Sequence, residues 1–135
     1  MKAQEMSENI RRFKIILRSL KKLSPNQPTG NYARRLTTLS YLIAGTIGSR
    51  SCQLPQVATK VTDNRQADST IKSFSRWISN EYVSFECYFL PFVQALLSLL
   101  CTNAIAIAID GSVVGRNCIT LMASVVYKNR ALPLC

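Results

Sequence analysis

The apolar positions in the first part of the chain recur every three or four residues, which is the period of helices with one buried face. We predict one helix from Ser7, as its N-cap, to about Lys22, and a second from Asn31 to a stop at Gly48. The loop at 24–31 has two prolines and a glycine, which disfavour helix. The expected apolar stripes are Ile10, Phe13, Leu17 and Leu20 in the first helix, and Leu36, Leu39, Ile43 and Ile47 in the second.

Residues 54–79 have the proportions of a helix-turn-helix. A short helix over 54–61, with Pro55 in its first turn, precedes a turn at Asp63-Asn64 and a helix over 68–79 capped by Asp68. We expect the second helix to bury Ile71, Phe74 and Ile78. The polar residues on its outer face are Ser69, Lys72, Ser73 and Arg76. Hydroxyls and cations near a helix N-terminus suit phosphate groups, although most short helix pairs are only packing units.

The period of the pattern changes in the last third of the chain. Residues 81–101 predict one long apolar helix, with an inner face of Leu90, Val93, Leu97 and Leu100. Isoleucine and alanine then alternate over 104–110, which predicts a strand with Ala104, Ala106, Ala108 and Asp110 on one face. Both faces are apolar, as in a central strand. A second strand over 117–127, a hairpin turn at Lys128-Asn129 and a third strand over 130–135 follow.

Residues 88–109 are long enough and apolar enough to need consideration as a membrane span. Five residues interrupt this segment: Pro91, Gln94, Ser98, Thr102 and Asn103. We therefore predict a buried helix followed by a buried strand and expect no membrane partner. A small membrane-associated protein is the least favoured alternative.

The basic charge is concentrated in the predicted helical part. The chain has 17 Lys and Arg against 7 Asp and Glu, a net charge of +10. Residues 1–80 hold 14 of the basic and 4 of the acidic residues, whereas residues 81–135 hold 3 of each. We interpret residues 1–86 as a basic helical region that binds a polyanion, with Arg34 and Arg35 beside the stripe of the second helix among the DNA-binding candidates. A basic surface that only favours solubility is the alternative.

The composition excludes several kinds of site. Without histidine, the chain has no Ser-His-Asp triad, no Cys-His pair and no Cys2His2 zinc site. Its five cysteines form no C-x-x-C pair: Cys52, Cys87, Cys101, Cys118 and Cys135. We expect buried free thiols in a reducing compartment. The N-terminal residues do not have the pattern of a signal peptide, so we expect a cytoplasmic protein.

Asp110 stands at the end of the apolar alternation, where a carboxylate is costly to bury without a partner. One interpretation is that Asp110-Gly111 starts a turn, as this dipeptide commonly does. The other is that Asp110 is a metal ligand on the small-residue face of the strand. From these residues alone, the turn is the better interpretation.

A wider motif favours the metal ligand. The sequence AIAIAIDGSVVGRNCITLMASVVYKNRALPLC resembles the opening of the catalytic core of DDE-type bacterial insertion-sequence transposases, in IDGS, VGR, LMASVVY and RALPL. LTTLSYLIAGTIGSRSCQLPQVATKV and IKSFSRWISNEYV resemble the helical N-terminal region of the same family. The resemblance implies an α+β fold, with a helical DNA-binding region followed by the first antiparallel strands of an incomplete ribonuclease H-like core over 87–135. It also implies that Asp110 is the first of three carboxylates that hold two Mg²⁺ or Mn²⁺ ions for DNA cleavage and joining.

The sequence departs from that family after Asp110, because no Asp or Glu follows it. We therefore expect the N-terminal piece of a transposase, which binds the double-stranded DNA of transposon ends but is inactive and holds no metal tightly by itself. The alternative is a DNA-binding regulator that inhibits transposition by occupying those ends or pairing with full-length transposase. We also expect residues 104–135 to be poorly stable alone and prone to aggregate, since an incomplete sheet exposes an apolar edge.

Overall fold

The computed structural model describes residues 2–61, 65–100, 105–113, 115 and 118–134, and its fold is α+β. The chain divides into two compact units, Met1–Phe92 and Val93–Cys135, called here the helical unit and the sheet unit. The helices are α1 (Lys2–Leu23), α2 (Gly30–Ser49), α3 (Leu54–Ala58), α4 (Ala67–Ile78), α5 (Phe85–Tyr88) and α6 (Leu90–Leu100). The strands are β1 (Ala106–Val113), β2 (Ile119–Tyr127) and β3 (Arg130–Pro133).

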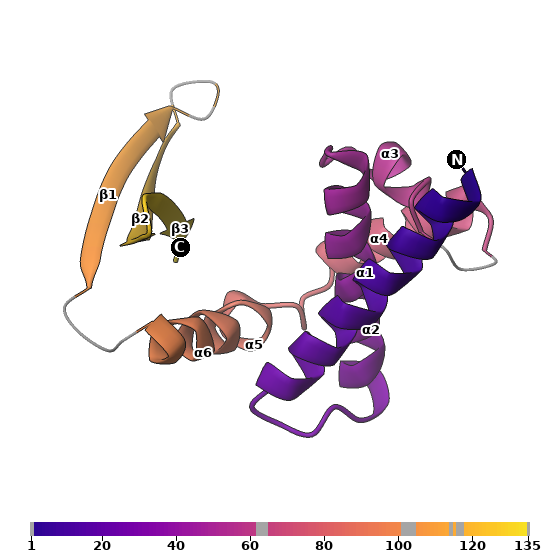
Figure 1. The fold of residues 1–135 in the computed structure, drawn as a ribbon, viewed down its shortest axis with the longest axis horizontal. Helices are drawn as coiled ribbons and strands as arrows, with labels where there is room; N and C mark the ends of the chain where they lie inside the picture. The colour runs from indigo at the N-terminus through magenta and orange to yellow at the C-terminus, as the bar shows by residue number, and fades with distance from the viewer. Residues whose placement is uncertain (1, 62–64, 101–104, 114, 116–117, 135) are drawn as a thin grey trace. The chain divides into compact units, whose positions relative to one another are not determined.

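The core of the helical unit forms around α2, which contacts α1, α3 and α4 (Figure 1). Leu36 of α2, Val57 of α3 and Phe74 of α4 are almost completely buried. A Cβ atom added at Gly45 would lie 2.7 Å from Val57 Cγ1 and 2.8 Å from its carbonyl oxygen. Glycine at position 45 thus allows the backbones of α2 and α3 to approach closely.

Helix α1 packs along α2 through an aromatic contact and small polar groups. The rings of Phe13 and Tyr41 stack with their centres 3.9 Å apart. Asn9 is buried, and its side-chain oxygen accepts a hydrogen bond of 2.8 Å from Arg12. A Cβ atom at Gly48 would lie 3.0 Å from that oxygen, so Gly48 forms part of the contact between α1 and α2.

The predicted bounds of the first two helices are partly wrong. Helix α1 begins at Lys2, and Ser7 is an exposed residue inside it rather than its cap. Helix α2 continues through Gly48 to Ser49, and the left-handed residue that follows is Arg50, with φ of 54°. Gly48 serves helix packing instead of helix termination. The predicted stripe of α2 is also inexact, since Ile47 is 52% exposed while Ser40 and Ala44 are buried.

The helix pair at 54–79 is present, with a shorter first helix than predicted and a second helix shifted by one residue. Helix α3 ends at Ala58 rather than at 61, and the Asp63-Asn64 turn lies outside the described residues. Helix α4 has Gln66 at its N-cap, and Asp68 lies in its first turn. Phe74 is buried and Ile71 half-buried as predicted, but Ile78, the last residue of α4, is 58% exposed and does not pack against the core of Val57, Ala58 and Phe74.

The long helix predicted over 81–101 is wrong, because the chain forms α5 and α6 with a break at Phe89. Pro91 has no N–H to donate to the carbonyl of Cys87, and its ring would clash with that carbonyl in a continuous helix. In the first turn of α6 a proline causes neither problem. Ser84 caps α5 by accepting a hydrogen bond from the backbone N–H of Cys87.

The sheet has the order β1-β2-β3 and is antiparallel throughout. The hairpin turn is confirmed, with φ of 47° at Lys128 and 61° at Asn129. Within the described residues β1 pairs with β2 alone, so the prediction that β1 is a central strand is wrong, and β2 takes that place. Every residue of β1 is exposed.

Two further expectations concern the cysteines and the membrane. Cys52, Cys87 and Cys118 are free but exposed, so their predicted burial is wrong, while Cys101 and Cys135 lie outside the described residues. Within the parts of the chain that the structure describes, each helix is too short or too polar to cross a lipid bilayer.

Candidate nucleic-acid interface

A shallow hollow of about 180 Å³ lies between α2 and the C-terminal half of α4. Its lining residues come from α2, from α4 and from the turn that follows α4. They are Arg34, Arg35, Thr38, Ser73, Arg76, Trp77 and Asn80, called here the basic hollow. Four of the six predicted DNA-binding residues therefore meet at one place: Arg34, Arg35, Ser73 and Arg76. The other two, Ser69 and Lys72, are exposed on α4 outside the hollow.

Two contacts fix the positions of the helices that form the basic hollow. Phe74 anchors the middle of α4 in the core with Val57 and Ala58. The indole N–H of Trp77 donates a hydrogen bond of 3.0 Å to the carbonyl oxygen of Arg35, 42 residues away in the chain. Since this bond joins the last turn of α4 to α2, it holds Arg76 and Arg34 on neighbouring elements.

Arg35 forms an ordered wall of the hollow. Its guanidinium carbon lies 5.1 Å from the centre of the Tyr82 ring, an arrangement in which the cation is attracted to the ring face. The neighbouring Tyr88 ring contacts the rings of Tyr32 and Trp77. Burial raises the pKa of the Tyr88 hydroxyl above its usual value, and the positive charge of Arg35 opposes that shift in part. Tyr88 is therefore neutral at pH 7, and the charge of Arg35 is not cancelled by a phenolate.

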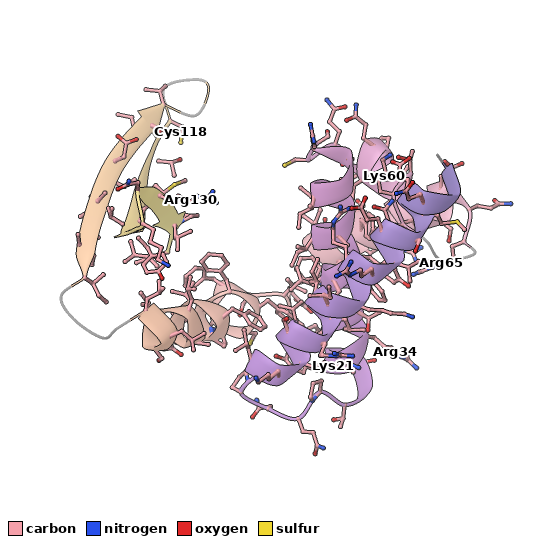
Figure 2. The ribbon with its side chains drawn as sticks, viewed as in Figure 1. Lys21, Arg34, Lys60, Arg65, Cys118 and Arg130 are labelled. Carbon is pink, nitrogen blue, oxygen red and sulfur yellow. The ribbon has the colours of Figure 1, made fainter. Side chains whose placement is uncertain are left out.

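Arg34 and Arg76 are the exposed cations of the basic hollow, and Figure 2 shows the Arg34 side chain extending from α2. Ser73 is half-buried between them, so its hydroxyl lies in the wall. Glu5, an acidic residue of the same unit, forms an ion pair with Lys60 instead. The hollow thus combines two exposed guanidinium groups with the half-buried hydroxyl of Ser73, a combination that suits bidentate binding of phosphate oxygens.

Trp77, Thr38 and Asn80 were not among the residues predicted from the sequence. Trp77 could have been identified from its position in a helix with a buried face, because a buried indole N–H usually donates a hydrogen bond to a nearby acceptor. Nothing in the spacing of Thr38 and Asn80 indicated the contact between α2 and the end of α4.

Asp110 lies within β1, directly opposite Met122 of β2. Strand β1 continues to Val113, so the interpretation of Asp110-Gly111 as a turn is wrong. The alternation of the strand places Ser112, with its partner Thr120, on the same face as Asp110. On β1 this face carries only small and polar side chains, while β2 adds Met122 and Val126 to it; Ile107, Ile109 and Val113 lie on the opposite face.

The donor groups around Asp110 do not by themselves fit a site for two Mg²⁺ ions. Such a site needs several carboxylate oxygens, and the Asp110 face offers one carboxylate with the three hydroxyl groups of Ser112, Thr120 and Ser124. Nowhere among the described residues do three or more His, Cys, Asp or Glu side chains gather as a metal-binding group.

Comparisons with known proteins do not place the chain in a family. No protein-family model, no curated protein and no solved structure matches it.

Proposed function

We propose that this chain is the DNA-binding part of a DDE-type bacterial insertion-sequence transposase, in which the helical unit binds double-stranded transposon-end DNA and the strands open a ribonuclease H-like core. The observation that carries the proposal is the basic hollow. It brings Arg34 and Arg76 together from helices that are distant in the sequence. The resemblance of the DGS motif and the strands to that family supplies the identity of the polyanion.

The shape of the hollow supports a nucleic-acid backbone as its ligand. A site for a small molecule is usually a deep, mostly apolar cavity of several hundred Å³. The basic hollow has about 180 Å³ and is lined by cations, hydroxyl groups and an amide. A phosphate on a duplex is a projecting group that such a shallow surface can contact from one side.

Asp110 is the residue that we assign to the catalytic core. In the proposal it is the first of three metal-binding carboxylates, which together hold Mg²⁺ or Mn²⁺. The sequence has no Asp or Glu after Asp110, so the other two must come from another segment or another chain. Cleavage and joining of DNA are therefore attributed to a complete transposase, and binding of DNA to this chain.

A DNA-binding regulator of transposition is the second candidate. The observation that favours it is the division of the chain, because the helical unit has a hydrophobic core of its own and contains the whole basic hollow. Such a unit can occupy transposon ends without a working core. A competition assay with intact transposase separates the candidates: a regulator lowers the transposition rate in proportion to the ends that it occupies.

The test of DNA binding is the double variant Arg34→Gln/Arg76→Gln, which removes the two exposed charges of the hollow. Affinity for a labelled duplex is measured by fluorescence anisotropy at several salt concentrations. Each phosphate contact releases counterions, so the slope of log K against log salt should shrink by roughly 1.8, about 0.9 for each charge. Arg35 is left in place because its contact with Tyr82 supports the fold.

The matched control is Arg50→Gln, which removes an exposed cation at the C-terminal end of α2, outside the hollow. We expect the slope for this variant to stay near that of the unchanged protein. A slope that is the same in the double variant and in the unchanged protein would show that the basic hollow does not contact DNA phosphates. If a separate variant, Lys72→Gln, and the double variant reduce the slope equally per charge, the contact follows the exposed face of α4 instead.

A further inference from the structure

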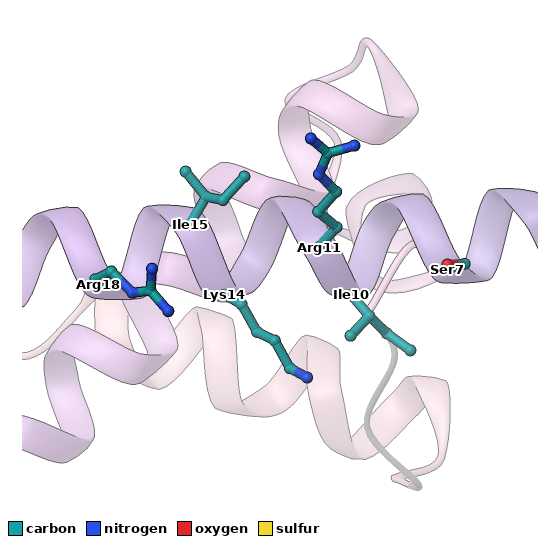
Figure 3. Close-up of a pocket in the computed structure, with 6 residues that line it drawn as sticks. All are labelled: Ser7, Ile10, Arg11, Lys14, Ile15 and Arg18. Carbon is teal, nitrogen blue, oxygen red and sulfur yellow. The ribbon is translucent and has the colours of Figure 1, made fainter.

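Helix α1 carries a second basic surface that the basic hollow does not include. Its residues recur every three or four positions and border a depression of about 410 Å³ along one side of the helix. They are Ser7, Ile10, Arg11, Lys14, Ile15 and Arg18, called here the α1 stripe (Figure 3). Arg11 and Ile15 extend from one border of the stripe, and Ile10 and Lys14 from the other.

The packing of α1 presents this stripe to solvent. The opposite side of the helix is occupied by α2, through the stacked rings of Phe13 and Tyr41 and through buried Asn9. Arg11, Lys14 and Arg18 are all exposed, about one helical turn or 5.4 Å apart along the axis. Exposed Lys21 and Lys22 extend the positive charge into the last turn of α1.

We propose that the α1 stripe is a second DNA contact, which binds the sugar-phosphate backbone without reading the bases. The inference rests on the proposed function, since it assumes that the helical unit binds DNA, but it uses different residues on a different helix. The backbone of DNA alternates anionic phosphates with apolar deoxyribose. The stripe alternates in the same way, with cations at 11, 14 and 18 and isoleucines at 10 and 15.

The isoleucines give the stripe its specific chemistry. Ile15 is 54% exposed between Arg11 and Arg18, where a helix that only needed solubility would carry a polar residue. Its side chain can cover a sugar ring while the neighbouring cations bind the flanking phosphates. The stripe has no Asn or Gln to pair with adenine, and the proposal assigns its arginines and lysine to phosphates rather than to guanine edges, so its contribution should be independent of DNA sequence.

An anionic membrane is the competing partner for a basic helix, and the packing of α1 disfavours it. Helices that lie in a membrane interface insert a broad apolar face between the lipids. The broad apolar face of α1 is already used, since Phe13 stacks on Tyr41, and Leu17 and Leu20 are half-buried. Two isoleucines among three cations are too narrow a surface for insertion.

The test is the triple variant Arg11→Gln/Lys14→Gln/Arg18→Gln of the full chain, compared with the unchanged protein and with Arg34→Gln/Arg76→Gln. Glutamine has nearly the helix propensity of the residues that it replaces, and far-UV circular dichroism checks that α1 is retained. We expect the slope of log K against log salt to shrink by roughly 2.7 for three lost phosphate contacts. The loss should be equal for duplexes of unrelated sequence.

Two further variants act as controls for the chemistry of the stripe. Arg11→Lys/Arg18→Lys keeps the charges, and it should keep the salt slope because counterion release depends on the number of neutralised phosphates and not on the shape of the cation. Ile15→Ser keeps every charge and removes the apolar contact with deoxyribose. It should weaken binding several-fold at every salt concentration with the slope unchanged.

The outcomes separate this inference from the proposed function. If the hollow variant reduces the slope and the triple variant does not, the inference is overturned while the proposed function stands. If the triple variant reduces the slope and the hollow variant does not, the stripe is the DNA contact and the basic hollow is not. If the triple variant keeps its DNA affinity and instead loses binding to phosphatidylglycerol vesicles, the partner of the stripe is a membrane and the inference is wrong.

Discussion

The helical unit and the sheet unit bury their apolar side chains to very different extents. In the helical unit Leu36 and Phe74 are at most 2% exposed, and three helices, α1, α3 and α4, contact α2. In the sheet unit Ile109 is 68% exposed and Leu121 is 69% exposed, although both belong to well-paired strands. Apolar sequence and backbone pairing therefore suffice to form a sheet, but not to close a core around it.

The register of the sheet shows where its uncovered surface lies. Ile109 is opposite Ala123, Gly111 is opposite Leu121 and Val113 is opposite Ile119, so most of the exposed aliphatic side chains of β1 and β2 share one face. An apolar face of this kind on an otherwise folded unit is a typical site of association. The expectation that residues 104–135 are poorly stable alone and prone to aggregate stays a prediction, and it follows from this face.

The largest expected difference between the two units comes from a pair of variants, each of which removes one large side chain from one unit. Phe74→Ala leaves a cavity beside Val57 and Ala58, and it should lower the free energy of unfolding of the helical unit by about 3–5 kcal/mol. Urea unfolding followed by Trp77 fluorescence measures this, because Trp77 is the one tryptophan of the chain and lies in α4.

The matched variant in the sheet unit is Ile109→Ala. Its side chain is 68% exposed, so the truncation creates no cavity, and the protection of β1 and β2 amides in hydrogen exchange should change by less than about 0.5 kcal/mol. A loss comparable to that of Phe74→Ala would mean that Ile109 is covered in solution, and the contrast between the units would fail.

A smaller effect on stability is expected from alanine substitutions at two glycines, one in each unit. Gly45→Ala places a methyl group 2.7 Å from Val57 Cγ1 and 2.8 Å from a backbone oxygen, so α3 must move away from α2. We expect a loss of about 1–3 kcal/mol in the Trp77 transition. At Gly111 the nearest atom to an added Cβ is Ile119 Cγ2 at 3.8 Å, and Gly111→Ala should fold normally. Equal tolerance of both substitutions would show that the contact between α2 and α3 is loose.

The sequence predicted the elements of both units better than their packing. The period of three to four residues identified α1, α2 and α4, and the alternation at 104–110 identified β1, although the strand continues to Val113. The hairpin turn was predictable because Asn129 tolerates its φ of 61°. The roles of Gly45 and Gly48 were not predictable, since a glycine at a helix crossing and a glycine at a helix end look alike in a sequence.

The candidate site was predicted only in part, because the periodicity of a sequence does not report contacts between helices. Arg34, Arg35, Ser73 and Arg76 were identified as polar residues on helices, but helical period gives the face of a residue and not its distance from another helix. Their meeting depends on Trp77 and the carbonyl of Arg35, a contact over 42 residues. For Asp110 the dipeptide rule favoured a turn, whereas pairing with Met122 keeps the strand extended. Nonlocal contacts decided both cases.

The smallest effect concerns the ion pair between Glu5 of α1 and Lys60, which follows α3 and links distant parts of the helical unit. The hydrogen bond from Lys60, followed by its positive charge, lowers the pKa of Glu5 below 4.5. A carboxyl group whose pKa is lowered in the folded state stabilises the fold at pH values above its unfolded-state pKa. This contribution is lost as the pH falls through the folded-state pKa.

Glu5→Gln should therefore lower Tm slightly at pH 7 and not at all at a pH well below 4.5. Because the pair is solvent-exposed, salt should reduce the difference. Glu8→Gln removes the same charge from the same helix without touching Lys60, and equal pH dependence in the two variants would show that the pair contributes only through net charge.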